Sequence, residues 1–184
     1  MTFGFYGKLP MAGDFLRRGL SVGFITAWDT WMQRTLEQLR QNKTSQAWRV
    51  AYLSAPIWRF SVAPGLLGPR GAAGIVMPSH DRVGRAFPFC IAVETDLPPL
   101  ASNLALQPVV ERLELAALRM TEADASLDAF ADHLAQLPGL ADVPYGLGQG
   151  AGSIWVAASL DVAPVICLPG LPEGAVQTSA LFDA

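Results

Sequence analysis

The sequence predicts a single α+β domain in which α-helices pack on a mainly antiparallel β-sheet. Its 184 residues fit the usual size of one domain. A hydrophobic content of 51% and a charged content of 16% allow a sizeable core and are too apolar for a disordered chain. Apolar runs of strand length outnumber helical patterns, and runs adjacent in the sequence are expected to pair as antiparallel strands. We therefore expect residues 1–184 to form one folded unit.

The first half of the chain is expected to contain one long helix and five strands. Apolar residues recur every three or four positions over residues 21–41, which is typical of an amphipathic helix, and Ser21 is its expected N-cap. Residues 11–20 are expected to be an irregular turn segment. Runs rich in aromatic and β-branched residues predict strands, with Pro88 near the start or edge of the last one. These strands are expected at residues 3–10, 47–55, 57–65, 74–79 and 86–95.

The second half is expected to contain two helices followed by two strands. Residues 95–103 break the chain, and a helix is predicted from Pro108, which suits the first helical turn, to Met120. A second helix is predicted over residues 126–137, because Pro138 and Gly139 stop it. The glycine-rich residues 145–152 form a connector, and strands are expected at residues 153–159 and 161–170.

The charge of the chain is unevenly distributed along the sequence. Residues 1–95 carry 11 Lys and Arg against 5 Asp and Glu, a balance of +6, whereas residues 96–184 carry 2 against 11, a balance of −9. This predicts a bipolar surface suited to oriented protein contacts. Nucleic-acid binding would need a sustained basic face, so we expect no nucleic-acid partner.

Neither the N-terminal residues nor the two cysteines indicate a secreted protein. No apolar run approaches the roughly 18 to 20 residues that span a bilayer, and the N-terminal residues lack the pattern of a signal peptide, so we expect a cytoplasmic protein without membrane insertion. Cys90 and Cys167 both lie within apolar runs, where free cysteine behaves as a small hydrophobic residue. We expect two buried thiols rather than a disulfide.

The segment MPSHDRVGRAFPF, residues 77–89, contains the residue types of a catalytic triad. Ser79, His80 and Asp81 are consecutive, however, and neighbouring side chains of an extended segment point to opposite faces. A triad needs the base within about 3 Å of the nucleophile and the acid behind the base, which this spacing cannot provide. No G-x-S-x-G elbow is present. A polar turn between two strands is the simpler interpretation.

Motifs for cofactors and metals are weak throughout the sequence. GLGQGAG, residues 146–152, precedes a strand rather than a helix, and GLLGPRGAAG lacks the Gly-Lys-Ser/Thr ending of a phosphate loop. The two histidines and two cysteines show no ligand spacing. We expect neither a cofactor nor a metal. Asp14 is expected to form a structural ion pair with Arg82 or Arg85 if their loops share one end of the sheet.

Four tryptophans occupy predicted elements: Trp28 and Trp31 on the helix, and Trp48 and Trp58 on successive strands. Core packing is the simplest role, because aromatic rings supply much of the buried area of a domain. An exposed tryptophan beside Arg59 would instead resemble an anchor for a partner protein. The sequence leaves both alternatives open.

Several segments together resemble a known family. GFYGKLPMAGDFLRRGL, WDTWMQ, WRVAYLSAPIWRFSVAPG, MPSHDRVGRAFPF, SIWVA and the GLP near the end are similar to the TagF family, accessory proteins of bacterial type VI secretion systems. The resemblance covers residues 3–183 and is most specific in the first 90 residues. The family also has an α/β fold with a mainly antiparallel sheet. Where a family tryptophan is expected, this chain has PRGAAG.

The resemblance implies a cytoplasmic regulator without catalytic activity, in the standalone form rather than fused to a phosphatase. Such regulators repress type VI secretion assembly post-translationally, and they are connected to a threonine-phosphorylation pathway with a kinase, a phosphatase and a forkhead-associated scaffold protein. The scaffold is therefore the expected partner, and a homo-oligomer is possible. The family pattern falls on Gly7, Lys8, Pro10, Gly13, Asp14, Phe15, Trp28, Trp31, Pro56, Trp58, Arg59, Phe60, Pro78, Ser79, Asp81, Arg82, Val83, Gly84, Arg85 and Pro88.

Eight of the residues singled out are candidates for binding a partner or for organising the loops. They are Lys8, Asp14, Trp58, Arg59, Ser79, Asp81, Arg82 and Arg85. One alternative is a small hydrolase or nucleotide-binding enzyme, whose cleft would bring together Asp14, Ser79 and Asp81. Another is a purely structural subunit, which would expose a large apolar patch.

Overall fold

The computed structural model describes residues 2–41, 43–144, 146–148, 150–158 and 163–182. Within these residues, seven strands form one sheet in the order β2-β1-β5-β4-β3-β6-β7, and each neighbouring pair is antiparallel. The strands are β1 (Gly4–Gly7), β2 (Leu16–Arg18), β3 (Trp58–Val62), β4 (Gly71–Met77), β5 (Phe89–Thr95), β6 (Ser153–Ala157) and β7 (Val165–Leu168). The helices are α1 (Val22–Arg40), α2 (Ser45–Ser54), α3 (Pro99–Arg119), α4 (Leu127–Gln136) and α5 (Gly174–Phe182). The predicted α+β class is confirmed.

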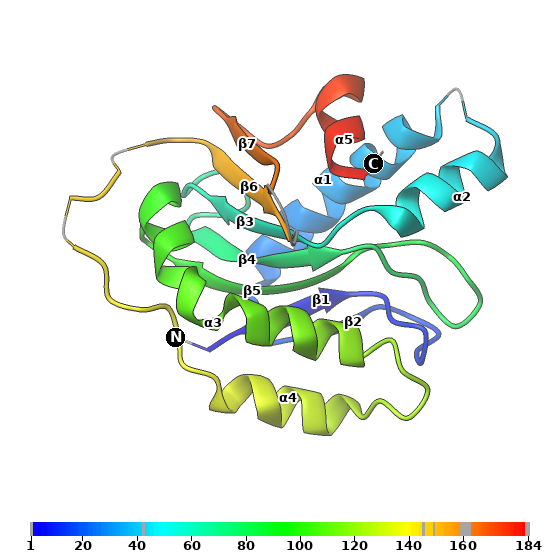
Figure 1. Cartoon of the computed structure of the whole chain (residues 1–184), viewed down its shortest axis with the longest axis horizontal. Helices are drawn as coiled ribbons and strands as arrows, with labels where there is room; N and C mark the ends of the chain where they lie inside the picture. The colour runs from blue at the N-terminus through cyan, green and yellow to red at the C-terminus, as the bar shows by residue number, and fades with distance from the viewer. Residues whose placement is uncertain (1, 42, 145, 149, 159–162, 183–184) are drawn as a thin grey trace.

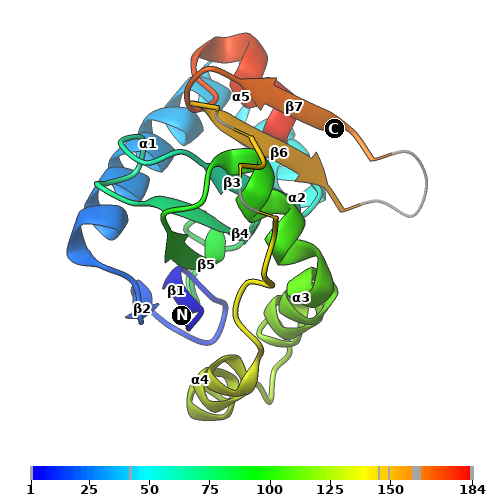
Figure 2. The same cartoon turned by 90° about the vertical axis from the view of Figure 1, so that its left-hand side faces the viewer.

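The sheet separates two layers of helices (Figures 1 and 2). On one face, α1, α2 and α5 pack over a core that contains Trp28, Trp58 and Trp155. On the other face, α3 and α4 cover a second core that contains Phe89 and Phe130. Helices α1 and α2, from the basic half of the sequence, therefore lie on one face together with α5, which contains no charged residue, and α3 and α4, from the acidic half, lie on the other.

Helix α1 forms as predicted. The Ser21 hydroxyl accepts a hydrogen bond from the Phe24 backbone N–H at 3.1 Å, and Glu94 of β5 accepts from both the backbone N–H and the hydroxyl of Ser21. This cap satisfies one of the free N–H groups at the helix start. The apolar stripe faces the sheet, with Trp28 and Met32 completely buried.

The predicted strand at residues 47–55 is wrong, because these residues belong to helix α2. Thr44 caps this helix by accepting a hydrogen bond from the Ala47 N–H at 3.2 Å. Trp48 and Tyr52, four residues apart, stack with ring centroids 5.3 Å apart. Aromatic content indicates a strand only weakly, and packing against the core overrides that preference.

The start of one helix and two whole elements also differ from the prediction. Helix α3 begins at Pro99, so Pro108 lies inside it rather than in its first turn. Pro108 is on the exposed face, where the carbonyl of Leu104 that lacks its helical partner can bond water. Strand β2 lies within the predicted irregular segment, and α5 was not predicted. Strand β5 begins at Phe89, three residues later than predicted, so that Pro88 directly precedes the strand.

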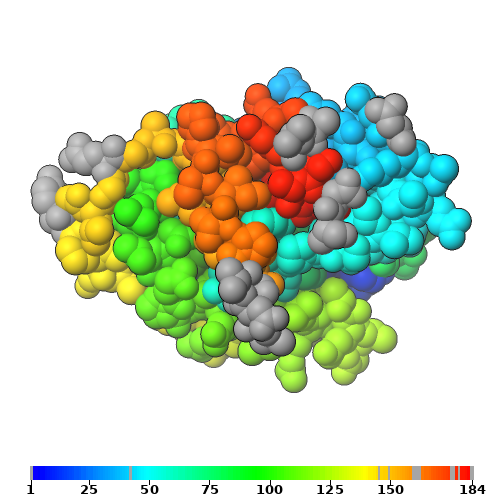
Figure 3. All heavy atoms as spheres, turned by 45° about the horizontal axis from the view of Figure 1, so that its top comes forward, coloured from blue at the N-terminus to red at the C-terminus, as the bar shows by residue number. Residues whose placement is uncertain are grey.

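The two cysteines are both free, but only one is buried. Cys90 of β5 lies in the core, where burial raises its pKa well above the ordinary value. Cys167 is exposed, which corrects the prediction of a buried thiol. It lies on β7, the edge strand, which is at the surface beside α5 in Figure 3. The apolar run around Cys167 alternates, so that Ile166 packs on the core and Cys167 does not.

Candidate functional site

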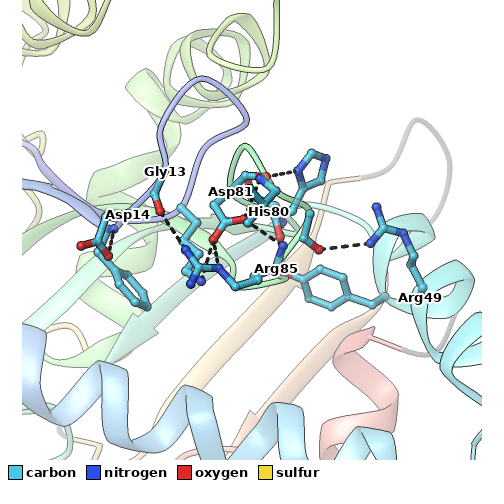
Figure 4. Close-up of polar contacts among 12 residues, drawn as sticks. Gly13, Asp14, Arg49, His80, Asp81 and Arg85 are labelled. Carbon is cyan, nitrogen blue, oxygen red and sulfur yellow. Dashed lines mark hydrogen bonds and ion pairs between the residues drawn. The ribbon is translucent and has the colours of Figure 1, made fainter.

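Asp81 is the centre of the loop that joins β4 to β5, the strand–turn–strand connection predicted from the sequence (Figure 4). Its side chain is completely buried. Oδ1 accepts hydrogen bonds from the backbone N–H groups of Val83 at 3.1 Å and Arg85 at 2.9 Å. The Asp81 carbonyl accepts from the Gly84 N–H at 2.8 Å, and Gly84 has the φ of 84° that favours glycine. One carboxylate thus fixes the whole turn.

Two cations complete the environment of the Asp81 carboxylate. Oδ2 lies 3.1 Å from Nζ of Lys8, itself buried, and 2.6 Å from Nε of Arg85. Burial alone would raise the pKa of Asp81. The hydrogen bonds from the Arg85 backbone, the Lys8 ammonium and the Arg85 guanidinium outweigh this effect and hold the pKa well below its usual range.

Lys8 reaches Asp81 because β1 ends against the start of β5. Gly7 has a φ of 140°, and a Cβ added there would lie 2.2 Å from the carbonyl oxygen of Pro88. Only glycine permits this approach, which places the next residue, Lys8, beside the turn. The Lys8 ammonium also lies 4.9 Å from the ring centroid of Phe15.

The loop after β1 and the loop after β4 are held together mainly through backbone carbonyls. Arg85 donates from Nη2 to the Gly13 carbonyl at 2.8 Å, and the Arg82 backbone N–H donates to the Ala12 carbonyl at 2.8 Å. The expected proximity of the loops is therefore present. The expected ion pair of Asp14 is not: within the described chain its exposed carboxylate accepts only from the Phe15 N–H and points away from Arg85 in Figure 4.

Ser79 and His80 do not form a catalytic group with Asp81. The Ser79 hydroxyl is buried and has no hydrogen-bond partner among the described residues. Its backbone N–H donates to the Tyr52 hydroxyl at 3.0 Å, and its carbonyl accepts from that hydroxyl at 2.9 Å. Nδ1 of His80 lies 2.9 Å from the Asp81 backbone carbonyl, not from the carboxylate. Asp14, Ser79 and Asp81, which the hydrolase alternative would bring together, share no hydrogen bond among the described residues.

Trp58 and Arg59 have structural contacts away from the loops. The Trp58 side chain is 2% exposed, and its Nε1 donates to the Leu181 carbonyl of α5 at 2.7 Å. Trp58 is thus a core residue rather than an exposed anchor. Arg59 points to the opposite face of the sheet and forms a two-pronged ion pair with Glu114 of α3, with N–O distances of 2.5 and 3.0 Å. The Glu114 hydrogen bond raises the pKa of Arg59.

Comparison with known proteins places this arrangement in a family. The family model of the TagF N-terminal domain, described as type VI secretion system-associated, matches residues 4–137. The chain belongs to the TagF family. The crystal structure of PA0076 from Pseudomonas aeruginosa PAO1 is similar, with 31% sequence identity and a TM-score of 0.79, over 98% of this chain and 94% of that one. No curated protein matches the chain.

The TagF match covers both loops of the site, but sequence reasoning missed one residue that organises them. Tyr52 holds the backbone of Ser79 from α2, and its role was hidden because α2 was predicted as a strand. In the described part of the chain, no group of three His, Cys, Asp or Glu residues could hold a metal ion. None of the described helices is both long and apolar enough to cross a membrane.

Proposed function

We propose that this TagF-family protein is a non-enzymatic cytoplasmic regulator that represses type VI secretion assembly post-translationally through protein–protein contacts. Family membership supports the connection to type VI secretion. The regulator acts with the threonine-phosphorylation pathway, and its direct partner is the forkhead-associated scaffold protein.

The observation that carries the proposal is the complete engagement of the Asp81 carboxylate. Its oxygens accept four hydrogen bonds from Val83, Arg85 and Lys8. The carboxylate therefore stabilises the turn. The polar cluster around Asp81 therefore holds the loop between β4 and β5 in one conformation. Outside it, the turn presents Val83, which is 72% exposed, and the exposed Arg82. A rigid loop with an exposed apolar and cationic tip suits recognition of a protein surface.

Co-purification from the native bacterium tests the proposal. The tagged protein, expressed from its own chromosomal locus, is expected to retain the forkhead-associated scaffold, identified by mass spectrometry. A strain with the untagged protein is the control for carry-over on the resin. Equal recovery of the scaffold from both strains would contradict the proposed partner.

A further inference from the structure

A groove of about 690 Å³ lies between the C-terminal half of α1 and the loop cluster described above. Its lining residues come from α1, from Phe15 of the loop after β1 (the first loop), and from Ala86 and Phe87 of the loop after β4 (the second loop). Helix α1, the pale blue ribbon in Figure 4, passes along these loops. We propose that this groove binds an acidic segment of the partner protein, an inference that deepens the proposed function and rests on it.

The floor of the groove is aromatic and held in place. Phe15 is 36% exposed although its ring packs on two others. It stacks on Tyr6 with centroids 5.4 Å apart, and it meets Phe87 edge to face at 4.8 Å. The hydroxyl of Tyr6 is fixed by a 2.7 Å hydrogen bond to Asp29 of α1. A half-exposed ring that is already immobilised loses little conformational entropy when a partner covers it.

The rim of the groove is positively charged. Arg34 and Arg40 of α1 line it against a single acidic residue, Glu37. Arg34 is exposed and has no ion pair or hydrogen bond with the described part of the chain. The guanidinium of Arg40 lies 4.4 Å from the ring centroid of Trp48, which holds it at the rim. Both charges are therefore available to an anionic ligand.

The positive surface continues beyond the groove toward the tip of the second loop. Arg49 of α2 follows Trp48 and donates a hydrogen bond to the Gly84 carbonyl at 3.1 Å. Its contact links α2 to the turn that Asp81 organises. The cationic surface thus runs from Arg40 over α2 to the loop, with Arg40 placed against an aromatic ring and Arg49 bound to a backbone carbonyl rather than to a carboxylate.

An acidic protein segment fits this surface better than a nucleic acid. The glutamine side chains on the rim suit the amide groups of a peptide, whereas a nucleic acid needs a sustained basic face. The chain carries a net charge of −3, and residues 120–142, in and around α4, contain five Asp and Glu and no Lys or Arg. This far face repels an acidic partner while the groove attracts it, so the charge distribution orients the encounter.

A direct binding measurement tests the groove without the natural partner. The probe is a synthetic peptide with six acidic residues around one phenylalanine, and the matched peptide has each acid replaced by its amide. We expect the intact protein to prefer the acidic peptide. The double variant Arg34→Glu with Arg40→Glu is expected to bind it about tenfold more weakly, because two attractive contacts become repulsive. The matched control, Arg112→Glu with Arg119→Glu on α3, changes the charge equally on the opposite face and is expected to bind like the parent protein.

Several results would overturn the assignment. These are equal binding of the acidic and amide peptides, equal weakening in both double variants, or displacement of the peptide by single-stranded DNA at the same or lower concentration. If loss of the Arg40–Trp48 contact unfolds the first double variant, Arg34→Glu alone serves, because this exposed side chain forms no hydrogen bond or ion pair within the described structure.

Titration with the purified scaffold separates this inference from the proposed function. Absence of scaffold binding by the parent protein would contradict the proposed partner. The peptide measurement would still show whether the groove binds an acidic segment. Scaffold binding that is unchanged in the Arg34→Glu, Arg40→Glu variant would leave the proposed partner in place and overturn the groove as its docking site.

Discussion

Replacing Asp81 with asparagine is expected to lower the Tm of the protein by about 10 °C at pH 7. The amide oxygen can still accept from the backbone of Val83 and Arg85, but the amide nitrogen then faces the Lys8 ammonium and the Arg85 guanidinium. A donor replaces an acceptor, and the buried Lys8 loses its counter-charge. Thermal unfolding followed by circular dichroism measures the change.

The effect of this substitution should depend on pH in a defined direction. The folded state holds the pKa of Asp81 below its usual value, so its contribution to stability is present above pH 4, near the unfolded pKa, and is lost as the pH falls further. The Tm difference between the parent protein and Asp81→Asn is therefore expected to shrink from pH 7 to pH 3. Asp14→Asn, on the neighbouring loop but exposed, is the control and should change the Tm little. Equal losses in the two variants would contradict the structural role of Asp81.

Replacing Trp58 with alanine is expected to reduce the free energy of unfolding by about 3 to 5 kcal/mol. The ring is buried between the sheet and the helix layer, and its Nε1 anchors the carbonyl of Leu181 in α5. Removing it leaves a cavity and a buried acceptor without its donor. Urea denaturation at pH 7 measures the loss.

Two further variants show whether the loss of stability in Trp58→Ala comes from the buried indole ring. Trp58→Phe keeps most of the ring and loses the hydrogen bond, so a smaller loss of about 1 to 2 kcal/mol is expected. Val83→Ala, at a residue 72% exposed, should change stability by less than about 0.5 kcal/mol. An unchanged stability of Trp58→Ala would mean that the indole is a surface anchor and not a core residue.

The parts of the fold predicted correctly have strong local signals. Helix α1 has both a cap and a long apolar stripe, and the strands β3, β4 and β5 are apolar runs bounded by turn residues. Helix α2 was mistaken for a strand because its aromatic residues pack on the core from a short helix with only Tyr52 fully buried. Local composition does not encode that packing, which depends on α1 and α5 being in place.

The candidate site was predicted in outline rather than in its contacts. The sequence predicts that Asp14 pairs with Arg82 or Arg85 if the loops after β1 and β4 lie at one end of the sheet, and these two loops are in contact. It assigned the ion pair to Asp14, whereas Arg85 pairs with Asp81 of its own turn and uses a backbone carbonyl of the first loop. Backbone carbonyls are present at every residue, so no sequence pattern marks the one that is used. The long-range contacts of Lys8 likewise become visible only when β1 lies beside β5.

The central claim, repression of type VI secretion by a contact-making regulator, is tested most directly by measuring secretion in the native bacterium. Deletion of the gene is expected to increase the secreted amount of type VI components, and expression of the protein from a plasmid is expected to reduce it. Transcript and cellular protein levels of the secretion components should stay constant, because the proposed control is post-translational. Secretion that is the same in the deletion strain and its parent would contradict the account.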